Sequence, residues 1–270
     1  MRTMRGMTPF LLASLVLFGA ACNKAGHETA GTAGTDTASS SAGSSSGSFG
    51  PTRPDTSAPP PLAPAPSDLA KDTVPLHAPD GSPARYGIET GRIVQRFTGN
   101  SVGERRITFA SYGTRERREE NTVPYPLGSR GAINNIIGIV TPQENAYADV
   151  RTRQGWKRRN EGFSRFLASP ESKKMSMAEY VVRTSGAERL PDTTISGYQC
   201  KVLRKNVNDM TITNWIWRGI VIREHLVSPK DSVEYYIEPV EITANIPVPD
   251  STFTFPAGYK IETYVAPSKP

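Results

Sequence analysis

The chain has 270 residues, of which 37% are hydrophobic, with a formal net charge of +6, two cysteines and three histidines. No spacing of these cysteines and histidines suits a zinc site, and no phosphate-binding glycine loop is present. We therefore expect neither a metal ion nor a cofactor.

The first 22 residues have the layout of a bacterial export signal. Arg2 and Arg5 precede an apolar run over 9–18, and small residues follow it. This run is about half of the roughly 20 apolar residues that a membrane-spanning helix needs, so we expect no spanning anchor. The next residue, Cys22, makes the segment similar to the lipobox of bacterial lipoproteins, although Gly19 stands where leucine is usual. The similarity implies that residues 1–21 are a signal peptide and that Cys22 carries lipid, including a fatty-acyl group such as palmitate; a plain signal peptide before an unmodified cysteine is the alternative.

Residues 22–83 have the composition of a disordered tether. Gly, Ala, Ser, Thr and Pro dominate the segment, and such a composition cannot bury enough apolar surface to offset the entropy of ordering. If Cys22 carries lipid, Cys200 has no partner in the chain and is a free thiol. By the usual sorting rule, Asn23 after the cysteine places the protein in the cell envelope at the outer membrane, facing the periplasm or the cell surface.

Positive charge is concentrated in the middle of the chain, where residues 85–205 hold 22 Lys and Arg against 12 Asp and Glu. Export argues against nucleic acid as the partner, so a basic rim that meets anionic lipid headgroups is one interpretation. The alternative is a solvated face that Glu116, Glu119 and Glu120 partly neutralise. The candidate rim residues are Arg151, Arg153, Lys157, Arg158 and Arg159.

Residues 84–265 form the predicted domain, and 266–270 form a tail. Apolar residues alternate with period two in most of the domain, which predicts a mainly β, antiparallel sheet. One helical insertion interrupts it: Ser176 and Glu179 fit a capping box, Gly186 suits the helix end, and shorter helices are expected over 162–167 and from Pro170. The apolar parity changes at Pro239, which predicts a β-bulge there.

Several strand motifs resemble one family of envelope proteins. G-Y-Q-C-K-V at 197–202, W-I-W-R-G-I at 215–220 and I-P-V-P-D-S-T-F-T-F-P-A-G-Y-K-I at 246–261 are similar to exported proteins related to the lipoprotein carrier LolA and receptor LolB. The resemblance implies a curved, incomplete β-barrel whose helical insertion covers the concave face above an apolar cavity.

Two functions of different classes follow. In the first, the half-barrel binds or senses a lipid or other hydrophobic ligand. In the second, it is a filled scaffold that docks a protein partner in the envelope. The one conceivable catalytic pair is Cys200 as nucleophile and His225 as base. We expect no catalysis, because Cys200 is predicted in the middle of a strand, where a cysteine is usually a small buried hydrophobic residue. The candidate cavity-lining residues are Phe97, Phe109, Tyr198, Trp215, Trp217 and Tyr235.

Overall fold

The computed structural model describes residues 61–126 and 133–264. The expected signal peptide, Cys22, the chain up to residue 60 and the tail at 266–270 lie outside the described residues. Within the described ranges, no helix is long and apolar enough to cross a membrane.

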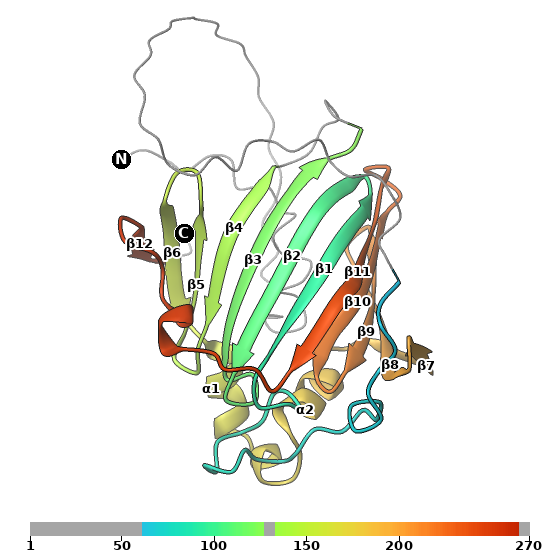
Figure 1. Ribbon diagram of the computed structural model, residues 1–270, viewed down its shortest axis with the longest axis vertical. Coiled ribbons are helices and arrows are strands. Elements are labelled where there is room, and N and C mark those ends of the chain that lie inside the picture. The colour runs from blue at the N-terminus through green and yellow to red at the C-terminus, as the bar shows by residue number, and fades with distance from the viewer. Residues whose placement is uncertain (1–60, 127–132, 265–270) are drawn as a thin grey trace, which may run out of the picture.

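A curved twelve-stranded sheet makes up most of the described chain (Figure 1). Its strand order is β12-β6-β5-β4-β3-β2-β1-β11-β10-β9-β8-β7, and every neighbouring pair is antiparallel except β12 and β6. The two end strands do not pair with each other, so the sheet is not closed into a barrel. The predicted class, a mainly β, incomplete barrel with a helical insertion, is confirmed. The strands are β1 (Gly91–Gly99), β2 (Ser101–Ala110), β3 (Arg115–Pro124), β4 (Asn134–Val140), β5 (Glu144–Asp149), β6 (Gln154–Arg159), β7 (Glu188–Ile195), β8 (Tyr198–Val207), β9 (Met210–Trp217), β10 (Ile220–Ser228), β11 (Val233–Ala244) and β12 (Lys260–Thr263).

The bulge predicted at Pro239 is present in β11. Val94 of β1 pairs with Glu241, whereas the next residue, Gln95, pairs with Pro239. Val240 is therefore an extra residue in β11. Because of this extra residue, Ile237 before the bulge and Ile242 after it lie on the same face, although one has an odd number and the other an even number.

Three short helices connect β6 to β7, namely α1 (Glu161–Ala168), the 3-10 helix η2 (Pro170–Lys173) and α2 (Met177–Thr184). The capping box is present, because the Ser176 hydroxyl accepts from the Glu179 backbone N–H and the Glu179 carboxylate accepts from that of Ser176. The helices pack on one another through Phe163, Phe166 and Met177. The helical insertion predicted from the sequence is confirmed.

The two faces of the sheet are covered by different parts of the chain. Figure 1 shows the helices behind the lower ends of the strands, on what we call the inner face, and the segment after β11 crossing the opposite, outer face. On the outer face, Ala110, Ile137 and Ile139 form a cluster with Phe253 of the 3-10 helix η3 (Asp250–Phe253). The helices therefore lie over one end of the inner face and leave the outer face to the C-terminal segment.

Residues 61–90, called the strap below, differ from the sequence prediction of a tether up to residue 83. Leu62 is buried, the Ala65 N–H donates to the Ser196 carbonyl at 2.8 Å, and the Gln199 N–H donates to the Ala70 carbonyl at 2.9 Å. The composition of this segment did not reveal its order, because backbone groups rather than side chains supply much of its bonding. The ordered domain begins by residue 61.

A single arginine in the turn between β9 and β10 binds the strap at three points. The Arg218 guanidinium donates to the carbonyl oxygens of Asp68 at 2.6 Å, Lys71 at 2.9 Å and Gly87 at 3.0 Å. Hydrogen bonds from a charged donor are the stronger kind, so this side chain fixes the path of the strap along the sheet.

Candidate functional site

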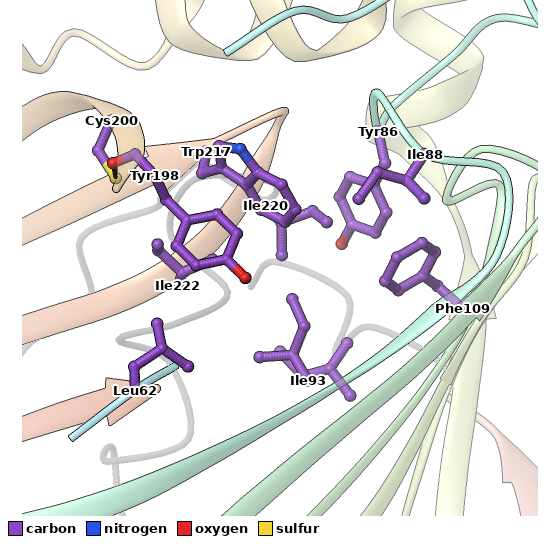
Figure 2. Packing of buried hydrophobic residues seen from close by; sticks show 11 residues of the cluster. Leu62, Tyr86, Ile88, Ile93, Phe109, Tyr198, Cys200, Trp217, Ile220 and Ile222 are labelled. Carbon is purple, nitrogen blue, oxygen red and sulfur yellow. Dashed lines mark hydrogen bonds between the residues drawn. The ribbon is translucent and has the colours of Figure 1, made fainter. Parts of the chain in front are cut away.

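The six aromatic residues predicted to line a cavity lie in two packed clusters. The first cluster, drawn in Figure 2, joins the strap to strands from both halves of the sheet. It contains Phe109, Tyr198 and Trp217, with the partly buried Trp215 packed against it, whereas Phe97 and Tyr235 belong to the second cluster.

The strap fills the space in front of the first cluster. The Trp217 ring is fully buried, meets the Tyr198 ring edge to face at 4.8 Å, and donates its indole N–H to the Leu69 carbonyl at 2.8 Å. In Figure 2 the Leu62 side chain points toward the same cluster. These aromatic side chains are arranged as a packed core that includes the strap.

The second cluster is also packed. The rings of Phe97 and Tyr235 lie 5.8 Å apart, and the cluster is completed by Ile212, Leu226 and Ile237. All five side chains are nearly or fully buried.

One of the five predicted rim residues, Arg158, lines a pocket on the inner face. The other four do not line it. Arg151 pairs with Asp149 at 3.6 Å, Lys157 pairs with Glu144 at 3.0 Å, Arg159 donates to the Ser164 hydroxyl at 3.2 Å, and Arg153 is exposed. The predicted basic rim is therefore not brought together as one site.

The floor of this pocket, called the arginine pocket below, is made by two neighbouring rows of residues that run across four strands. Residues two apart on a strand point to the same face of the sheet. Each row consists of residues that pair with one another across β3, β4, β5 and β6, and the two rows are two residues apart on every strand, so they lie side by side on the inner face. The first row is Arg118, Gly138, Tyr147 and Trp156, and the second is Glu116, Val140, Asn145 and Arg158. All of these except Trp156 line the pocket.

Gly138 leaves room for a ring in the first row. A β-carbon at this position would lie 2.9 Å from a ring atom of Tyr147, closer than such contacts normally allow. The Tyr147 ring therefore lies over the glycine, on the side facing Arg118.

The strap and the helical insertion provide the walls. The backbone N–H groups of Arg85 and Tyr86 both donate to the Tyr112 carbonyl, at 3.0 and 2.9 Å, which directs Arg85 toward the pocket. Asn160, the N-cap of α1, and Met177, at the start of α2, complete the lining. Sheet, strap and helices thus meet at this one place.

A buried carboxylate holds the basic side chains in position. Glu116 is 1% exposed and accepts hydrogen bonds from Arg118 at 3.0 Å, from Arg85 at 3.4 Å and from the Tyr86 hydroxyl. Burial acts to raise the pKa of Glu116, but the positive charges of Arg118 and Arg85 outweigh it and lower the pKa below its ordinary value. Burial also raises the pKa of Tyr86, so the phenol stays protonated and donates.

On the pocket floor, the buried polar atoms Arg118 Nε and Asn145 Oδ1 have no hydrogen-bond partner. Buried polar atoms are usually satisfied, and a bound molecule is one way to satisfy them. The open space is about 40 Å³, against the roughly 10–15 Å³ that one water needs. It therefore admits a small polar group.

Most residues of the arginine pocket were missed at the sequence level. Of these residues, Glu116 was named from the sequence only as part of a solvated face, which is one of two interpretations, and Arg85, Arg118, Asn145, Tyr147, Asn160 and Met177 were not singled out. A usable signal is present on three of the four floor strands, where charged, polar or aromatic residues stand two positions apart, as in E-x-R at 116–118, N-x-Y at 145–147 and W-x-R at 156–158.

The described residues show little that suits catalysis. No group of three or more His, Cys, Asp and Glu side chains within the described ranges is placed to hold a metal ion. Cys200 is the buried free thiol that the sequence predicted, and burial raises its pKa to about 12, which disfavours the reactive thiolate. His225 bonds instead to Glu234 at 2.8 Å and stacks on Tyr236.

No protein-family model and no curated protein matches this chain. Among solved structures, an uncharacterised conserved protein from Thermus thermophilus is similar with 9% identity and a TM-score of 0.41, over 65% of this chain and 91% of that one. MucB in complex with MucA(peri) is similar with 14% identity and a TM-score of 0.31, over 62% and 54%. A putative outer membrane lipoprotein-sorting protein domain from Vibrio parahaemolyticus is similar with 7% identity and a TM-score of 0.28, over 61% and 89%. At these values the similarities assign no function to this chain.

Proposed function

We propose that this protein is a non-enzymatic lipoprotein of the cell envelope, anchored through Cys22, that binds a ligand at the inner face of its half-barrel. The observation that carries the proposal is the arginine pocket, where Arg118 Nε and Asn145 Oδ1 are buried without a partner beside an open space. A ligand in this space would offer hydrogen-bond partners to the side chains of Arg118 and Asn145.

The pocket suits a ligand with a polar end and an apolar part. Val140, Tyr147 and Met177 line it together with the charged groups, and Met177 also belongs to the apolar cluster of the helices. A lipid or another amphiphile meets this description, with its polar group in the pocket and its apolar part against the helices.

Mass spectrometry of the mature chain, purified from membranes in detergent, tests both parts of the proposal. We expect the denatured chain to carry acyl groups on Cys22 and the native chain to carry an additional non-covalent ligand. Asn145→Leu, which removes the unpartnered polar atom, should reduce the occupancy, whereas Asn121→Leu, at an exposed position of β3, should not. A wild-type chain that carries no ligand when isolated and takes up none from a membrane lipid extract would contradict the binding role.

A second function is favoured by the packing of the aromatic clusters. Phe109, Tyr198 and Trp217 are nearly or fully buried, as expected of a filled scaffold that docks an envelope protein. In that case cross-linking in intact cells should capture one partner protein, and Asn145→Leu should leave the cross-link unchanged.

A further inference from the structure

We infer that the arginine pocket binds a doubly charged phosphate-type group, such as the phosphate of a monoester. The inference rests on the proposed function, which requires only that the pocket holds some ligand. The same chemistry can come from free phosphate or from the headgroup of a lipid.

The net positive charge of the pocket lining matches a ligand with two negative charges. Three arginines, Arg85, Arg118 and Arg158, and one carboxylate, Glu116, line the pocket, which leaves a balance of three minus one, or +2. On the same face, two residues from Arg118 along β3, Glu120 forms an ion pair with Arg105 at 2.9 Å, so these two side chains add no net charge. A carboxylate ligand would neutralise one of the two charges, whereas a phosphate monoester would neutralise both.

Arg158 is the guanidinium most available to a ligand. No ion pair within the described residues involves it, and its guanidinium carbon lies 5.5 Å from the centre of the Trp156 ring. The ring supports one face of the guanidinium and leaves its N–H donors for a ligand, and a planar fork of donors matches the oxygens of a phosphate.

The other donors lie on the same floor. Arg118 is 24% exposed, and its Nε has no partner while its NH2 holds Glu116 at 3.0 Å. Asn145 pairs in register with Arg158 on the neighbouring strand, and its terminal amide offers N–H donors when rotated by half a turn. Glu116 does not compete for the ligand, because it already accepts from Arg85, Arg118 and Tyr86.

Isothermal titration calorimetry on the mature chain in detergent tests the inference, with inorganic phosphate, acetate and dioctanoyl phosphatidic acid as probes at neutral pH and constant ionic strength. We expect phosphate to bind at least about tenfold more tightly than acetate. Arg158→Gln should weaken phosphate binding about tenfold or more, as expected for the loss of a charged hydrogen bond. Arg159→Gln is the matched control, because it removes the same charge from the next residue of β6, outside the pocket lining, and should leave the affinity within about twofold. Asn145→Asp, a second variant that places a negative charge in the pocket, should weaken phosphate binding as well, by about tenfold or more.

Comparing the affinities for phosphatidic acid and for inorganic phosphate distinguishes a lipid headgroup from free phosphate as the ligand. A lipid headgroup is identified if phosphatidic acid binds more tightly than inorganic phosphate and Arg158→Gln weakens the binding of both. Equal affinities of the wild type for the two probes identify free phosphate. The inference is overturned if phosphate does not bind at millimolar concentration, if acetate binds as tightly, or if folded Arg158→Gln, checked by circular dichroism, binds phosphate like the wild type. A wild-type chain that carries a ligand without phosphate overturns the inference alone, whereas a chain that binds no ligand and no probe overturns the proposed function as well.

Discussion

Replacing Trp217 with alanine is expected to lower the free energy of unfolding by about 3–5 kcal/mol, the usual cost of removing a large aromatic side chain from a packed core. The structure gives the reason. The ring is fully buried, contacts Tyr198 edge to face at 4.8 Å and donates its N–H to Leu69 of the strap at 2.8 Å. For a domain of 150–250 residues the change corresponds to a fall of roughly 6–20 °C in Tm.

Urea unfolding followed by far-ultraviolet circular dichroism measures the change without relying on tryptophan fluorescence. Trp217→Phe is the informative control, because it keeps most of the ring contacts and loses the hydrogen bond to Leu69, which should cost about 1 kcal/mol on its own. Trp215→Ala should cost less than Trp217→Ala, since Trp215 is only partly buried.

A cavity-lining role for Trp217 would give the opposite result. If Trp217→Ala costs less than about 1 kcal/mol and instead lowers the occupancy of the ligand, the ring contacts ligand rather than core, and the packed strap described above is not its main partner.

Two further predictions concern the buried carboxylate and the strap. Because the folded pKa of Glu116 lies below its ordinary value of 4.5, its ionised form stabilises the fold above that pH, and the contribution is lost as the pH falls through the folded pKa. Glu116→Gln should therefore cost about 1–3 kcal/mol at neutral pH, and its urea midpoint should fall less than that of the wild type on acidification; parallel acid sensitivity in the two chains would contradict this. Limited proteolysis should leave a resistant fragment that begins near residue 61, since Ala65 and Ala70 are hydrogen-bonded to the sheet, and N-terminal sequencing that finds a start near residue 80 would count against an ordered strap.

Local sequence signals were sufficient for the elements of the fold. Alternation predicted the strands, Ser176 and Glu179 predicted the start of α2, and the parity change at Pro239 predicted the bulge in β11. Each of these signals depends on residues a few positions apart, so the sequence displays them directly.

The strap and the arginine pocket depend on contacts between distant segments, which local patterns do not display. The strap is held at Asp68 and Lys71 by Arg218, which lies 150 and 147 residues further along the chain, and nothing in the Pro-rich composition of the strap indicates that partner. Similarly, Glu116 is surrounded by arginines in the sequence and looks solvated, but Tyr86 and Arg85 cover it in the fold. The curvature of the sheet came from a family resemblance, because alternation does not distinguish a flat sheet from a half-barrel.

The strap has a mechanical consequence for a domain held by its N-terminal end. Tension between a membrane and this domain would enter at residue 61 and load the contacts of residues 65–71 with the β7–β8 hairpin and with Arg218, then the contact of Gly87 with Arg218, before it reached β1. Arg85 lies further along the same strap and forms a wall of the arginine pocket. If Cys22 is the anchor and the pocket holds a ligand, as proposed above, a pull strong enough to peel the strap away would open that wall and couple the force on the anchor to the release of the ligand.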